Sequence, residues 1–135
     1  MADSALIKKL LLKPGQKAAV FNPPAWYLER LGPLPEGVEL VAKPSAPLDF
    51  VHLFVKDKAG LDMSIPQALR SLKDDAIFWI SYPKGSAKVK TDLNRDLLWK
   101  LMETHGFNGV AMVSIDENWS AMRFRPKDMV GKSRK

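Results

Sequence analysis

The sequence predicts a single α/β domain with a mostly parallel sheet of about six strands, flanking helices and a C-terminal antiparallel hairpin. Apolar strand-like segments alternate with amphipathic helical segments, which is typical of a parallel sheet covered by helices. Two of the strand-like segments, 49–55 and 76–81, are apolar on both faces, as strands buried between two helical layers are. The last two are separated by a tight turn around Glu117-Asn118, which favours a hairpin.

The first half of the chain alternates between helical and extended patterns. Apolar residues from Leu6 to Leu11 recur at helical spacing, and Pro14-Gly15 ends that helix. Pro24 suits the first turn of the second helix, and Gly32 its C-terminal end. The expected elements are a helix over 6–11, a strand over 17–22, a helix over 24–31, and strands over 38–42 and 49–55.

The second half begins with a capping-box pattern, Ser64-Ile65-Pro66-Gln67, which predicts the start of a helix. A second helix is expected from about Thr91 to His105, because Gly106 follows it and leucines recur at helical spacing within it. The remaining expected elements are strands over 76–81, 110–116 and 119–125.

The composition is that of one globular domain. The chain has 135 residues, of which 46% are hydrophobic and 27% charged. We expect one domain over residues 1–126 and a basic, flexible tail over 127–135. The absence of cysteine excludes disulfides and thiolate chemistry, and two histidines are too few for a multi-histidine metal site. No segment is apolar enough to span a bilayer or to form a signal peptide, so we expect a cytoplasmic protein without membrane contact.

The formal net charge is +6, from 21 basic and 15 acidic residues. The tail holds four basic residues and one acidic residue and so contributes +3 of this charge. Alternation places Arg123 and Arg125 on one face of the last strand, where they would extend a cationic surface or form the solvated end of an outer strand. Nucleic-acid binding is therefore an open but weakly supported alternative.

Several segments resemble known families. The stretches LLLKPGQKAAVFN and LRSLKDDAIFWISYPKG, followed by the hairpin, resemble a shortened class I methyltransferase, which has a Rossmann-like sheet. FNPPAWYLERLG, FWISYPKGSAKVKTDLNRD and IDENWSAMRFRP together resemble a family of short bacterial proteins of unknown function, over roughly residues 5–126. That second resemblance implies no activity, substrate or site residue.

The chain departs from the methyltransferase pattern at two places. Active relatives carry a glycine-rich loop after the first strand, where this chain has Asn22-Pro23-Pro24, and two prolines remove two N–H donors. Relatives also place an acidic residue after the second strand, where this chain runs through Ala42 into Lys43. We therefore expect neither a bound cofactor nor standard methyl transfer.

The best functional signal is the segment from Tyr82 to Arg95, which follows a buried strand and runs into a helix. Lysines near a helix N-terminus predict an anion pocket, because free N–H groups and the helix dipole favour negative ligands. The alternative is a solvated loop in which Thr91 caps the helix. Asn94 falls on the leucine stripe of the helix and would face inward. The candidate ligand-binding residues are Asn22, Lys84, Ser86, Lys88, Lys90, Thr91, Asn94 and Arg95.

Two further residues have more than one interpretation. His52 lies within an apolar strand, which favours a hydrogen-bonded core histidine over a catalytic base. Trp99 falls on the polar side of its helix, where it would be semi-buried or would anchor a partner. The leading hypothesis is a non-enzymatic binding or adaptor domain that accepts a phosphate-containing small molecule or a protein. The alternatives are an enzyme of non-standard chemistry in the same cleft and a weak nucleic-acid-binding protein.

Overall fold

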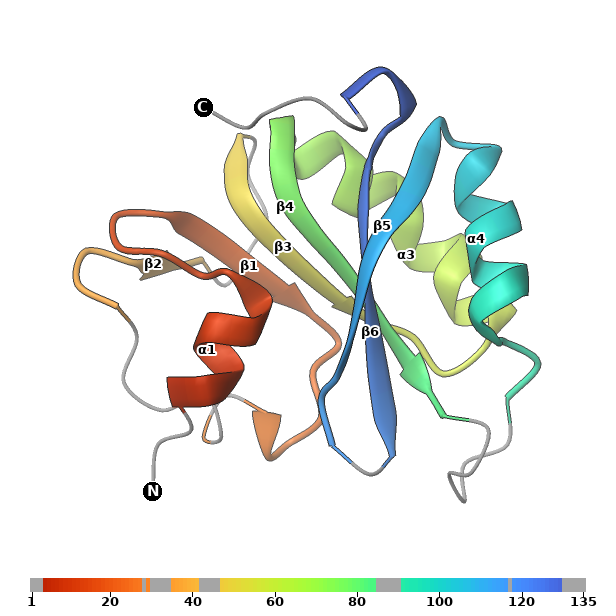
Figure 1. The fold of residues 1–135 in the computed structure, drawn as a ribbon, viewed down its shortest axis with the longest axis horizontal. Coiled ribbons are helices and arrows are strands. Elements are labelled where there is room, and N and C mark those ends of the chain that lie inside the picture. Colours follow the sequence, from red (N-terminus) through yellow and green to blue (C-terminus); the bar gives the residue numbers. More distant parts are fainter. Residues whose placement is uncertain are drawn as a thin grey trace.

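The computed structural model describes residues 4–27, 29, 35–41, 47–84, 91–116 and 118–129. Within them, six strands form one mixed sheet with helices on both faces (Figure 1), which confirms the expected fold class. In chain order the elements are α1 (Ser4–Leu10), β1 (Lys17–Phe21), β2 (Glu39–Leu40), β3 (Leu48–Phe54), α3 (Lys58–Ser71), β4 (Leu72–Pro83), α4 (Arg95–Glu103), β5 (Phe107–Ser114), β6 (Trp119–Pro126) and the 3-10 turn η1 (Lys127–Met129).

The strand order across the sheet is β2-β1-β3-β4-β6-β5. The first four strands are parallel, and β6 runs antiparallel to both of its neighbours. The hairpin is therefore confirmed, but β6 is an inner strand and β5 forms the edge. The expectation that Arg125 lies at the solvated end of an outer strand is wrong. Its strand, β6, is flanked by β4 and β5, and only 7% of the surface of Arg125 is exposed.

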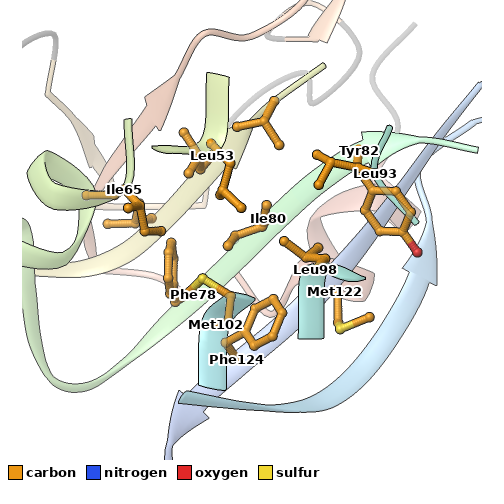
Figure 2. Close-up of a cluster of buried hydrophobic side chains, with 14 of the residues drawn as sticks. Leu53, Ile65, Phe78, Ile80, Tyr82, Leu93, Leu98, Met102, Met122 and Phe124 are labelled. Carbon is orange, nitrogen blue, oxygen red and sulfur yellow. The ribbon is translucent and has the colours of Figure 1, made fainter. Parts of the chain in front are cut away.

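Two side-chain layers cover the sheet. Along β3, Val51 and Leu53 point to the layer of α3 and α4, whereas Phe50 and Phe54 point to the layer of α1. Figure 2 shows the α3/α4 layer, in which side chains of β3, β4 and β6 meet those of α3 and α4. The two-faced apolar pattern that predicted buried strands at β3 and β4 thus reflects a core on each side of the sheet.

The helix expected to begin at Ser64 begins six residues earlier, at Lys58 in α3. Asp57 is its N-cap, and its carboxylate accepts a hydrogen bond of 2.8 Å from the Gly60 amide. Ser64 and Pro66 lie inside the helix. The Ser64 capping pattern was therefore misleading, because an acceptor earlier in the chain already satisfies the first helical turn.

The helix expected from Thr91 begins at Arg95, and its N-cap is Asn94. The Asn94 side chain accepts a hydrogen bond of 2.9 Å from the Leu97 amide and is exposed, so the expectation that it faces inward is wrong. The Thr91 hydroxyl instead accepts from the Leu93 amide at 3.0 Å, which makes a local turn before the helix.

Other boundaries differ by a few residues. β5 begins at Phe107, three residues before the expected strand, and β4 extends back to Leu72. The extra residues of β4 form an irregularity, since Leu48 pairs with Leu72 but Phe50 pairs with Ile77. Of the helix expected over 24–31, only 24–27 and 29 lie within the described residues. There, the Tyr27 amide closes a turn on the Pro24 carbonyl at 3.0 Å.

Candidate ligand-binding site

An open cleft lies at the carboxyl ends of β1 and β3. From β1, the chain passes to β2 on one side of the sheet and later to β3 on the other, so the two strands form a switch point. Open α/β sheets bind their ligands at such points. The cleft has a volume of about 600 Å³ and is lined by Asn22, Pro23, Pro24, Phe54, Val55, Lys56, Asp57, Gly60 and Trp119.

The wall after β1 consists of Asn22, Pro23 and Pro24. Asn22 has a φ of +57°, a left-handed conformation that asparagine tolerates better than most residues. Its side-chain amide donates a hydrogen bond of 3.2 Å to the Ser64 hydroxyl on α3. The turn is thus tied to the helix across the cleft. The two prolines offer no N–H group to a ligand in this wall.

The aromatic part of the cleft comes from Phe54 at the end of β3 and Trp119 at the start of β6. Their rings meet edge to face, with centroids 5.3 Å apart. The Asp116 carboxylate accepts hydrogen bonds of 2.8 Å from the Asn118 and Trp119 amides, which fixes the turn that presents the tryptophan. Two ordered aromatic rings favour an apolar or planar ligand group.

The N-terminus of α3 forms the third wall. The Gly60 amide donates to Asp57, and the Lys58 amide donates to the Asp92 carboxylate at 2.9 Å. Two of the amides that a helix N-terminus offers to anions are therefore already satisfied by carboxylates of the protein. Lys56 is exposed beside them and brings positive charge to the cleft.

A buried polar network lies beneath the cleft. The Tyr27 hydroxyl and His52 Nδ1 are 2.6 Å apart, and His52 Nε2 and the Ser81 hydroxyl are also 2.6 Å apart. Phe54, which lines the cleft, stacks on the His52 ring with centroids 4.3 Å apart. The imidazole has no exposed surface.

Burial determines the protonation of this network. It lowers the pKa of His52 to about 3, so the imidazole is neutral at pH 7, and it raises the pKa of the Tyr27 hydroxyl. A serine, a histidine and a tyrosine in hydrogen-bonding contact can transfer protons among themselves. Here all three side chains are fully buried, with 0% of their surface exposed, so none of them can reach a ligand in the cleft. The expectation of a hydrogen-bonded core histidine is confirmed.

The structure places only part of the predicted lysine segment. Lys84 directly follows Pro83, which pairs with Trp119, so its backbone lies next to the cleft. Its ammonium group donates a hydrogen bond of 2.7 Å to the Ser114 hydroxyl. Ser86, Lys88 and Lys90 lie outside the described residues.

The remaining predicted residues are not gathered at the cleft. Thr91 and Asn94 use their side-chain oxygens on amides of their own segment, as described above. Arg95 makes an ion pair with Asp96 at 3.4 Å and lines a different hollow, beside Trp99. Of the five candidates that the structure describes, only Asn22 lines the cleft, and Lys84 neighbours it.

Sequence reasoning missed Phe54, Asp57 and Trp119 as lining residues. Each is an unremarkable residue at the end of a strand or the start of a helix. Only position could have indicated Phe54 and Asp57. The strands β1 and β3 are parallel neighbours, so the residues at their carboxyl ends lie side by side at the same end of the sheet. Trp119 could not be found this way, because it enters from the antiparallel strand β6.

No model of a protein family and no curated protein sequence matches the chain, so its likeness to a family of short bacterial proteins stays a prediction. Its fold is similar to that of solved methyltransferases. A SAM-dependent methyltransferase from Aquifex aeolicus matches with a TM-score of 0.62 and 14% identity, covering 90% of this chain and 87% of that chain. The 1,6-didemethyltoxoflavin-N1-methyltransferase of Burkholderia thailandensis matches with a TM-score of 0.56 and 16% identity, covering 93% and 76%.

Fibrillarin, a pre-rRNA processing protein from Methanococcus jannaschii, also matches, with a TM-score of 0.53 and 14% identity over 86% of this chain and 68% of that chain. At these identities the likeness shows the fold alone: this chain has a methyltransferase-like α/β fold. No helix in the described part of the chain is long and apolar enough to cross a membrane. Nor do the described residues contain a group of metal-ligating side chains.

Proposed function

We propose that this chain is a binding protein that holds a small ligand in the switch-point cleft without catalysing methyl transfer. The observation that carries the proposal is the cleft itself, which lies at the carboxyl ends of β1 and β3 and is lined by Phe54 and Trp119. Its volume of about 600 Å³ is in the range of small-molecule sites. The aromatic rings would contact the apolar or planar part of the ligand.

The other part of the ligand carries a phosphate or similar anion. Lys56 lines the cleft, and Lys84 follows the β4 residue that pairs with Trp119. In the sequence, Ser86, Lys88 and Lys90 follow within six residues of Lys84. Lysine binds phosphate as a flexible point charge, so the lysines of this segment would favour an anionic ligand.

The residues of the cleft do not fit the adenosyl cofactor in the way that the class I resemblance implies. Pro23 and Pro24 stand where backbone donors are needed, and the Gly60 amide is already bonded to Asp57. His52 does not line the cleft: it is buried beneath Phe54 and has a pKa of about 3. These features support binding over catalysis.

Thermal unfolding in the presence of nucleotides, sugar phosphates, polyphosphate and a short RNA tests this proposal. A ligand at about 100 times its dissociation constant adds about 2.7 kcal/mol of stability and should raise the midpoint by several degrees. We expect one small phosphate compound to do so, and we expect the shift to survive moderate salt. The double variant Lys88→Glu/Lys90→Glu should abolish the shift.

The matched control is Lys8→Glu/Lys9→Glu, which makes the same change in net charge at two exposed positions of α1. This control should bind as the wild type does. If both variants lose binding equally, the charge of the whole protein is responsible and the site is wrong. A wild type that no phosphate compound stabilises would also overturn the proposal.

A second candidate is an enzyme of non-standard chemistry in the same cleft, as a degenerate relative of the methyltransferases. It is favoured by the position of the cleft, together with neighbours named as methyltransferases, one of them in complex with S-adenosylhomocysteine. Calorimetric titration with S-adenosylhomocysteine separates the two. Binding that Trp119→Leu weakens would favour this candidate, and no binding would remove the support that the methyltransferase neighbours give it.

A further inference from the structure

The two edges of the sheet are protected to very different degrees. The β2 edge is two residues long and includes the charged Glu39. The β5 edge is eight residues long, FNGVAMVS, and contains neither a charge nor a proline, although its register against β6 shifts between Gly109 and Ala111. Proteins that remain monomeric usually shorten their edge strands or place charges and prolines on them, because unpaired backbone groups at an edge can pair with another strand.

Apolar side chains gather along this edge. Met112 is 43% exposed, Trp99 on α4 is 38% exposed and Val110 is 36% exposed. With Arg95, Gly109, Ala111 and Met122, they line a hollow of about 300 Å³ between α4 and β5. Trp99 is thus semi-buried, one of its two expected states, and its exposed part also leaves it able to anchor a partner.

Gly109 explains how the tryptophan is held at this surface. A Cβ atom at position 109 would lie 2.9 Å from the Met122 sulfur and 3.3 Å from Trp99 Cε3. The indole therefore lies directly over the glycine backbone, and a side chain there would displace it. An aromatic ring that is already fixed loses little entropy on binding, as is typical of residues that contribute strongly to interfaces.

We propose that a second copy of this chain occupies the edge, with β5 pairing antiparallel to β5 of the other copy about a two-fold axis. The result would be one continuous sheet of twelve strands, with the two α4 helices on the same face. A two-fold interface uses the same patch twice, so the patch must be self-complementary. This surface is independent of the switch-point cleft.

Charge identifies the second copy as the occupant. The chain has a net charge of +6, so two copies repel each other over most of their surface, but β5 itself carries no charge. The exposed charges of α4 are balanced, with Arg95 and Lys100 against Asp96 and Glu103. A two-fold axis would set the N-terminal end of one α4 toward the C-terminal end of the other, which brings Arg95 of one copy toward Glu103 of its partner. Such pairing of opposite charges favours self-association.

Sedimentation of the full chain over a concentration series tests this proposal. We expect a monomer–dimer equilibrium in the wild type. Met112→Lys places a like charge from each copy close to the two-fold axis and should raise the dissociation constant at least tenfold, and Trp99→Ala should raise it as well. The control is Leu40→Lys, which adds the same charge at a 36% exposed position on the β2 edge and should leave the equilibrium unchanged.

A second experiment uses the absence of cysteine. In the Ala111→Cys variant the only thiols of a dimer would lie close to the two-fold axis, so mild oxidation should give a covalent dimer, whereas Leu40→Cys should not. A wild type that sediments as a monomer at every concentration overturns the proposal and leaves the edge to a different protein. So does a dimer that resists Met112→Lys and does not cross-link through Ala111→Cys.

Discussion

The two layers that cover the sheet hold their elements in place by different means. The layer of α3 and α4 is built from aliphatic, methionine and aromatic side chains (Figure 2). The layer of α1 contains similar apolar residues, but directional bonds cross it as well. There, His52 links Tyr27 to Ser81, and the Trp79 indole donates a hydrogen bond of 2.8 Å to the Leu10 carbonyl.

The difference follows from how each layer is connected to the sheet. Helix α3 joins β3 to β4 through short connections, since only three residues precede it and β4 begins directly after Ser71. Apolar contacts are enough for a helix that is fixed at both ends. Tyr27 and Leu10 belong to segments that do not pair with the sheet, and apolar contact alone would let them slide. Buried hydrogen bonds fix their position, because an unpaired polar group in the core is costly.

The largest effect is expected for His52→Leu. This substitution keeps the volume of the side chain approximately but leaves the Tyr27 and Ser81 hydroxyls without their shared partner. An unsatisfied buried hydroxyl costs about 1–3 kcal/mol, so we expect a loss of about 2–6 kcal/mol. Urea unfolding of the two proteins measures it. Leu53→Met is the matched control on the apolar layer, where a swap that conserves volume should cost less than about 1.5 kcal/mol.

The triple variant Tyr27→Phe/His52→Leu/Ser81→Ala sharpens the test. It removes every member of the network at once, so no hydroxyl is left unpaired, and we expect it to recover most of the stability lost by His52→Leu. If the triple variant is less stable than His52→Leu, the network stabilises through packing of its rings, and the contrast between the two layers fails.

Sequence patterns predicted the parts of the fold that depend on local burial. The two-faced apolar segments at β3 and β4 were interpreted correctly, because a strand's pattern reports which of its faces is covered. The alternation in β6 separated its two faces correctly, but the pattern could not show that this strand lies inside the sheet. Helix starts were placed less well. Asp57 and Ser64 are both good N-cap residues, and which of them is used depends on tertiary contacts, such as the bond from Asn22 to Ser64.

The candidate site was harder to predict for the same reason. The lysine segment stood out because its charges are neighbours in the sequence. The cleft combines ends of β1, β3 and β6, which become neighbours only through the strand order of the sheet. Trp119 and Phe54 are 65 positions apart, and no local pattern connects them. Asn22 was identified from its position alone, because it ends the first strand of the expected sheet.

The next effect is a dependence of stability on pH that arises from His52. Burial lowers its pKa to about 3 in the folded protein, from 6.5 in the unfolded chain. Between these values the unfolded state binds one more proton, so stability falls as the pH is lowered through this window. From pH 7 to pH 5, the wild type should lose about 2 kcal/mol relative to the triple variant, which lacks this histidine.

Urea unfolding of both proteins at pH 7, 6 and 5 measures this difference, and the carboxylates that both proteins share cancel in it. A stability difference that stays constant from pH 7 to pH 5 would mean that the pKa of His52 is the same in the folded and unfolded protein. Water would then reach the imidazole, and the α1 layer would not bury His52 as the structure shows.

The smallest effect is expected for the N-cap bond of α3, which lies at the end of the helix and outside the core of the α3/α4 layer. Asp57→Ala removes the N-cap of α3 and leaves the Gly60 amide without its acceptor. Because water can reach this amide, the loss should be about 1 kcal/mol by urea unfolding, well below that of His52→Leu. Asp57→Asn keeps the acceptor oxygen and should lose only a few tenths of that amount. A loss for Asp57→Ala that equals the loss for His52→Leu would show that both layers depend equally on directional bonds, and that the apolar contacts in Figure 2 do not by themselves hold α3 on the sheet.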